Sequence, residues 1–74
     1  MSRAGEGFEV EPHLDPTRRT RFDLTYQGRA VAYDLDDMTE VQSYVARWIR
    51  TGRAPAGATV TLVHPDGYRE VVRR

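Results

Sequence analysis

The sequence predicts an α+β sandwich, with one helix packed on one mainly antiparallel sheet. Residues 21–35 carry apolar residues at alternate positions on both sides of a short turn, and residues 60–72 carry apolar residues on both sides of a Pro-Asp-Gly turn, as hairpins do. Between them, residues 38–49 carry apolar side chains at helical spacing. At 74 residues the chain has room for a single core. The predicted order is therefore strand, strand, helix, strand, strand.

The N-terminal stretch differs in amino-acid composition from the rest of the chain. We predict a mostly flexible arm over residues 1–19, followed by a single domain over residues 20–74. The exception is residues 7–11, where Phe8 and Val10 alternate with two glutamates ahead of Pro12. This period of two predicts a short additional N-terminal edge strand. We expect Phe8 and Val10 to bind a partner by docking this strand on a sheet edge.

The first hairpin turns at Gln27-Gly28. A two-residue turn there fixes a register in which the apolar residues share one face and opposite charges meet on the other. The predicted pairs are Tyr26 with Arg29, Leu24 with Val31, Phe22 with Tyr33, and Arg21 with Asp34.

The helix begins after Asp37, which with Glu40 three residues later forms a variant of the capping box. Arginines near its end and Gly52 beyond it mark the C-terminus. Its apolar arc ends at Trp48 and Ile49, so we expect Trp48 to be buried under the sheet.

The second hairpin turns at His64-Pro65-Asp66-Gly67, which suits a type I turn followed by a left-handed glycine. This geometry pairs residues across the turn. The predicted pairs are His64 with Tyr68, Leu62 with Glu70, and Val60 with Val72.

Composition excludes several classes of protein. The absence of cysteine removes disulfide scaffolds, zinc ribbons and thiol nucleophiles. All 11 basic residues are arginine, which points to a GC-rich bacterial source. They are balanced by 11 acidic residues, so the net charge is zero. No stretch is apolar enough for a signal peptide or a membrane span, so we expect a cytoplasmic protein without membrane contact.

Two groups of residues have the chemistry of a catalytic site. Four carboxylates gather at the helix start: Asp34, Asp36, Asp37 and Glu40. They could hold a metal ion or act as general acid and base, but helix N-termini also attract acidic residues for structural reasons. His64 near Asp66 has no nucleophile beside it in the sequence. We therefore predict no enzyme, no metal and no cofactor, with a hydrolase as the third-ranked alternative.

Arginines near the helix end and on the last strand form a candidate nucleic-acid surface, since folding could gather them. They are Arg47, Arg50, Arg53, Arg69, Arg73 and Arg74. Zero net charge argues against a dedicated nucleic-acid domain. Nucleic-acid binding is therefore the alternative function and not the favoured one.

The run from Phe8 to Arg53 resembles the N-terminal oligomerisation domain of actinobacterial H-NS-like nucleoid silencers. The resemblance is carried by Tyr26-Gln27-Gly28 at the turn, Tyr33-Asp34-Leu35 before the helix, and residues 48–53 at its end. It implies dimerisation through the sheet and helix. Family members continue into an Arg-Gly-Arg DNA-binding region, which this chain lacks, so DNA binding is not implied.

These observations predict a small non-enzymatic interaction module. A core this small often completes itself by association, and a four-stranded sheet under one helix leaves edges to pair. We expect a homodimer, with a protein partner at a sheet edge as a further possibility.

Overall fold

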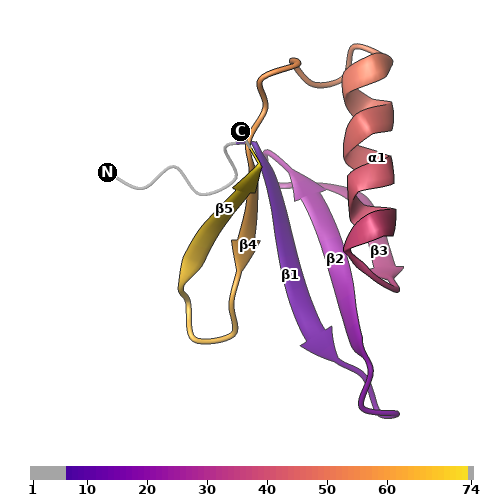
Figure 1. The fold of residues 1–74 in the computed structure, drawn as a ribbon, viewed down its shortest axis with the longest axis vertical. Coiled ribbons are helices and arrows are strands. Elements are labelled where there is room, and N and C mark those ends of the chain that lie inside the picture. The colour runs from indigo at the N-terminus through magenta and orange to yellow at the C-terminus, as the bar shows by residue number, and fades with distance from the viewer. Residues whose placement is uncertain (1–6, 74) are drawn as a thin grey trace.

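The computed structural model describes residues 7–73, which form five strands and one helix (Figure 1). The elements, in chain order, are β1 (Phe8–Leu14), β2 (Thr20–Tyr26), β3 (Arg29–Leu35), α1 (Met38–Arg50), β4 (Val60–Val63) and β5 (Arg69–Arg73). The α+β class and the order of two strands, one helix and two strands after β1 are confirmed.

The five strands form one mixed sheet in the order β3-β2-β1-β4-β5. Neighbouring strands are antiparallel except for β1 and β4, which are parallel. Because β3 and β4 are not neighbours, α1 and the following loop carry the chain across one face of the sheet (Figure 1). The two edges of the sheet are therefore β3 and β5.

The N-terminal strand lies in the centre of the sheet, so its predicted edge position is wrong. Phe8 and Val10 are fully buried between β2 and β4, and the folded chain exposes neither side chain to a partner. An alternating pattern reports the two faces of a sheet and carries no information about its edges. Of the arm predicted over 1–19, residues 1–6 lie outside the described part, and Phe8–Leu14 belong to the sheet.

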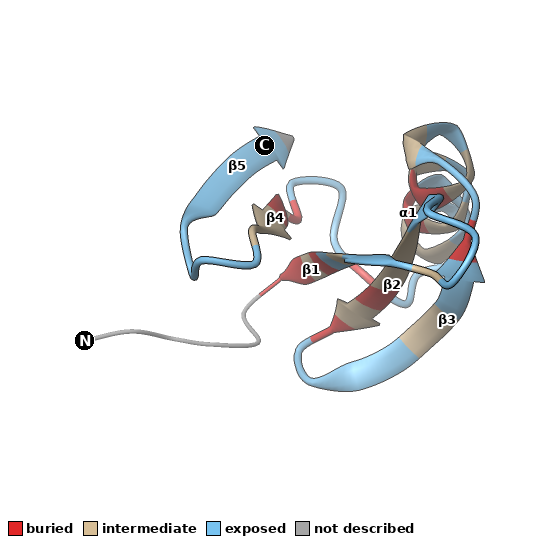
Figure 2. Cartoon of the chain, turned by 90° about the horizontal axis from the view of Figure 1, so that it is seen from below, coloured by how far each residue is buried: buried red, intermediate tan, exposed pale blue. Residues whose placement is uncertain are grey.

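The core lies between α1 and the strands that it covers (Figure 2). Val41 and Val45 are the buried residues of the helix, and they face a layer that includes Phe8 and Leu24. Trp48 is only partly buried, which corrects the prediction that the sheet would bury it. Its ring packs edge-on against Phe8 at a centroid distance of 6.2 Å.

The register of the first hairpin changes twice along its length. The pair Tyr26 and Arg29 is as predicted, but Leu24 pairs with Ala32 and Phe22 with Leu35. Extra residues in β3 form bulges at these two points, so the strand no longer alternates regularly. The predicted core position of Tyr33 is wrong as a result, because its side chain is 63% exposed.

The second hairpin closes as its turn residues predict. Gly67 has a φ of 94°, and its N–H donates to the carbonyl of His64 at 2.9 Å. The N–H of His64 in turn donates to the carbonyl of Tyr68 at 2.8 Å. Leu62 pairs with Glu70 as expected. A shift near the end of β5 places Arg73, not Val72, opposite Val60.

The ends of α1 follow the predicted capping signals. The Asp37 carboxylate accepts from the N–H of Glu40 at 3.0 Å, and the Glu40 carboxylate accepts from the N–H of Asp36 at 2.8 Å. At the other end Gly52 has a φ of 79°, and the Arg53 N–H reaches back to the Trp48 carbonyl at 2.9 Å. No helix of the described residues is long and apolar enough to cross a membrane.

Candidate interaction surfaces

The first candidate surface is the β4–β5 hairpin, residues 60–73, which we call the wing. The helix packs over β2 and β3 and leaves the wing uncovered (Figure 1). Figure 2 shows that β5 is exposed, and this holds for each residue from Arg69 to Val72. Tyr68, Val71 and Val72 are 62%, 48% and 37% exposed, respectively. The wing therefore offers apolar side chains beside the unpaired outer edge of β5.

Specific contacts hold the wing against β1. Three residue pairs join β1 to β4, and the Arg69 guanidinium forms an ion pair with the Glu9 carboxylate. Within the wing, the His64 imidazole lies 3.0 Å from the Glu70 carboxylate and 5.4 Å, between centroids, from the Tyr68 ring. Within the wing, the outer edge of β5 has no backbone neighbour among the described strands.

The opposite edge, β3, is shaped differently. Its two bulges interrupt the regular spacing of hydrogen-bonding groups, and Asp34 takes a left-handed φ of 65°. The N–H of Asp34 donates to the Asp23 carboxylate at 3.0 Å, which holds the bulge in place. An irregular edge of this kind discourages pairing with another chain.

The carboxylates Asp34 and Asp36 surround Arg21. The Arg21 Nε lies 2.6 Å from Asp34, and its Nη1 lies 2.7 Å from Asp36. Desolvation lowers the pKa of Arg21, but the hydrogen bond to Asp34 and the charges of both carboxylates outweigh it and raise the pKa. Arg21 and Asp34 therefore form an ion pair, although the shifted register does not place them opposite each other as predicted.

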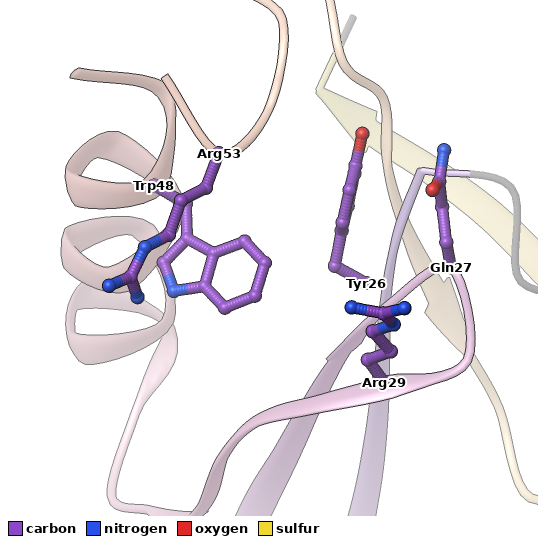
Figure 3. A pocket seen from close by; sticks show the side chains of 5 residues that line it. All are labelled: Tyr26, Gln27, Arg29, Trp48 and Arg53. Carbon is purple, nitrogen blue, oxygen red and sulfur yellow. The ribbon is translucent and has the colours of Figure 1, made fainter. Parts of the chain in front are cut away.

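The second candidate surface is a pocket between the first hairpin turn and the C-terminal end of α1 (Figure 3). Its volume is about 680 Å³, and it is lined by Tyr26, Gln27, Arg29, Trp48 and Arg53. The Arg53 guanidinium lies over the indole of Trp48, 5.6 Å from the ring centroid. Figure 3 shows the edge of the Trp48 ring pointing into the gap toward Tyr26 and Arg29, with the Arg53 guanidinium on the other side of the indole. The pocket therefore combines two cations, two aromatic rings and one amide.

The structure divides the predicted arginine surface. Arg47, Arg50 and Arg53 stay together at the end of α1. Arg69 is the first residue of β5 and forms an ion pair with Glu9. The backbone of Arg73 lies opposite Val60, and Arg74 lies outside the described residues.

Sequence reasoning missed Arg29 as a member of the arginine group at the helix end. It is 18 positions from Arg47, the first arginine of the helix, and it belongs to a different element. A signal was nevertheless present, because the predicted register places Arg29 opposite Tyr26, on the sheet face that the helix covers. Cross-strand neighbours share a face, so Arg29 reaches the helix side.

The residues considered for catalysis have structural partners. Asp37 and Glu40 cap α1, while His64 contacts Glu70 and not Asp66. The Asp66 carboxylate accepts from the N–H of Tyr68 at 2.9 Å. In the part of the chain that the structure describes, no group of three or more acidic, histidine or cysteine side chains could hold a metal ion.

Comparisons with protein-family models, with curated proteins and with solved structures found no match for this chain. The functional argument therefore depends on the two surfaces themselves.

Proposed function

We propose that this chain is a non-enzymatic interaction module that forms a homodimer through the outer edge of β5. The observation that carries the proposal is an unpaired edge strand flanked by exposed apolar side chains, in the part of the sheet that α1 does not cover. Two copies of β5 side by side would join the two sheets into one. Backbone pairing supplies affinity in this mode, and the flanking side chains supply selectivity.

Charge supports a second copy as the occupant of the wing. The chain has 11 basic and 11 acidic residues, so two copies meet without long-range repulsion. β5 begins with one basic and one acidic residue, Arg69 and Glu70, and both already have partners within the chain, so this part of the strand brings no net charge to the contact. A partner of strong single-sign charge would not match this edge as well.

The choice of β5 over β3 depends on regularity. Arg69, Glu70 and Val71 pair in sequence with β4 before the single shift near the end of the strand. The edge formed by β3 is bulged twice. A second β5 therefore finds an uninterrupted set of donors and acceptors over the first half of the strand.

The test is the molar mass in solution at tens of micromolar protein, measured by light scattering after size exclusion. We expect the wild-type chain to elute near twice its 8.5 kDa mass. Val71→Lys places a charge among the apolar residues of the wing and should weaken the dimer at least tenfold. Because Val71 is half exposed, circular dichroism should show an unchanged fold.

The matched control is Tyr33→Lys, which adds the same charge to an exposed residue on the opposite edge. It should leave the dimer intact. A monomeric wild-type chain at these concentrations would refute self-association. A dimer lost in Tyr33→Lys and kept in Val71→Lys would move the interface to β3.

A further inference from the structure

We propose that the pocket lined by Tyr26, Gln27, Arg29, Trp48 and Arg53 binds a nucleotide, with its phosphate on Arg29 and its base against the surface formed by Trp48 and Arg53. This pocket lies at the end of β2 that meets the helix C-terminus, and none of its lining residues belongs to the wing. The inference therefore does not depend on self-association.

The charge of the pocket selects an anion. Its lining contains two arginines and no acidic residue. Within residues 7–73, the ion pairs of arginine involve Arg19, Arg21 and Arg69, which leaves Arg29 and Arg53 without a carboxylate partner. A guanidinium group binds phosphate oxygens through two parallel N–H donors, so Arg29, which lies across the gap from Trp48, suits a phosphate, while Arg53 lies against the indole (Figure 3).

The aromatic surface of the pocket favours a ligand in which a flat ring is attached to the phosphate. Trp48 is partly exposed, and its indole is braced edge-on by Tyr26 at 5.7 Å and by Phe8 at 6.2 Å between centroids. Arg53 adds a second flat group over the indole. Bases of single-stranded nucleic acid stack on aromatic rings and on guanidinium planes in this way.

The backbone at both arginines is held in place before any ligand arrives. Arg29 follows a tight turn in which Gln27 and Gly28 have φ values of 50° and 81°, and the Gln27 N–H donates to the Gly7 carbonyl at 3.0 Å. Arg53 follows Gly52 at the capped helix end, where its own N–H is bonded to the Trp48 carbonyl. A backbone that is already ordered loses less entropy on binding.

The size of the pocket fits this class of ligand. At about 680 Å³ it lies within the range of roughly 300–1,000 Å³ found for small-molecule sites. The same chemistry is present in a free nucleotide and in a nucleotide within a single strand. A duplex presents its bases already stacked, so it offers phosphate without a free ring face.

The experiment uses the fluorescence of Trp48, the one tryptophan of the chain. The full chain is titrated with thymidine monophosphate, with a short single-stranded oligothymidylate, and with a duplex of the same length. We expect saturable quenching by both single-stranded ligands, with an affinity that falls as salt rises. The oligothymidylate binds more tightly than the monophosphate if the natural source is a strand, and equally if it is a free nucleotide.

The variants are Arg29→Gln and Arg53→Gln, followed by anisotropy of a labelled oligothymidylate so that changes at Trp48 itself do not disturb the readout. Arg29→Gln should weaken binding about tenfold or more, the cost of one charged phosphate contact, and Arg53→Gln should weaken it through loss of the flat cation over Trp48. Arg18→Gln is the matched control, since it removes one exposed arginine from the loop at the opposite end of β2. It should leave the affinity within twofold.

Three results would overturn the proposal. Equal weakening by Arg18→Gln and Arg29→Gln would reduce the effect to general charge attraction. Duplex binding as tight as single-strand binding would remove the role of the aromatic surface. Quenching by a peptide with a C-terminal phenylalanine carboxylate, and not by either nucleotide ligand, would assign the pocket to a protein terminus.

Discussion

This chain has two hairpins, each with two strands joined by a short turn, but the helix covers only the first of them. β2 and β3 lie under α1 and contribute the buried side chains of Leu24, Tyr26 and Leu35. In the wing, β4 is buried where it adjoins β1, while β5 is exposed. A helix is about 10 Å wide and strands are about 4.8 Å apart, so one helix covers two to three strands of a sheet.

Because of this difference, we expect the covered half to determine the stability of the fold and the wing to determine association. The covered half, β1–β3 with α1, encloses most of the core, including the fully buried Phe8, Val10 and Leu24. The wing adds backbone pairing to β1 and leaves apolar area at its outer edge. Substitutions in the covered half should therefore change the free energy of unfolding, and those in the wing should change association.

The largest effect expected from this comparison comes from Phe8→Ala. Phe8 is fully buried and its ring lies 4.7 Å from that of Tyr26, so its removal leaves a cavity between the sheet and α1. The free energy of unfolding should fall by about 3–5 kcal/mol, measured by urea denaturation. Tyr68→Ala in the wing removes a ring of similar size and should change it by no more than about 0.5 kcal/mol. Equal losses in the two variants would mean that the wing shares the core.

A smaller effect is expected where the wing joins the covered half, at Gly7. Its φ is 76°, and a Cβ there would lie 2.5 Å from Thr59 Oγ1 and 3.0 Å from the Thr59 carbonyl oxygen. The adjacent Phe8 N–H donates to that same carbonyl at 2.8 Å. Gly7→Ala should therefore strain the start of the β1–β4 ladder and destabilise the fold by about 2–3 kcal/mol.

Gly28→Ala is the control that distinguishes, in Gly7→Ala, the steric clash of the new Cβ from the strain of a left-handed backbone. Gly28 has a similar φ of 81° but nothing within 4 Å of the added Cβ. It should cost only the left-handed penalty of about 1–2 kcal/mol. If thermal melts give the same loss for both glycines, the contact with Thr59 does not hold the wing in place.

The sequence was sufficient for the parts of the fold that local chemistry decides. The capping residues of α1 and the turn at His64-Pro65-Asp66-Gly67 behave as predicted, because each depends on hydrogen bonds within a few residues. The first pair beyond the Gln27-Gly28 turn is also correct. Local signals of this kind do not depend on the rest of the fold.

The sequence was insufficient where distant segments decide the outcome. The bulges in β3 depend on Leu35 reaching the core and on Asp23 holding the N–H of Asp34, and neither is visible as a pattern. The central position of β1 follows from the crossover of α1, not from its alternation. Of the candidate pocket, Arg53 was predicted as a binding residue, whereas Arg29 was missed because no helical spacing links the two.

The smallest expected effect on stability comes from two loop aspartates, Asp15 in the covered half and Asp66 in the wing. In the β1–β2 loop, the Asp15 carboxylate accepts three hydrogen bonds, from the Thr17 N–H at 3.0 Å, the Thr17 hydroxyl at 2.7 Å and the Arg19 N–H at 2.9 Å. In the wing, Asp66 accepts one, from the Tyr68 N–H. Asp15→Asn should therefore lower stability at neutral pH more than Asp66→Asn does.

The pH dependence identifies the charged form of Asp15 as the cause. The hydrogen bond from the Thr17 side chain, with those from the backbone, lowers the pKa of Asp15 below its ordinary value of 3.8. A group whose pKa is lower in the folded chain binds fewer protons there, so its stabilisation is complete above about pH 4 and disappears as the pH falls through the folded pKa. The difference in unfolding free energy between wild type and Asp15→Asn should thus shrink between pH 5 and pH 2, as measured by urea denaturation at each pH. A difference that stays constant over this range would show that the carboxylate charge contributes nothing to the loop.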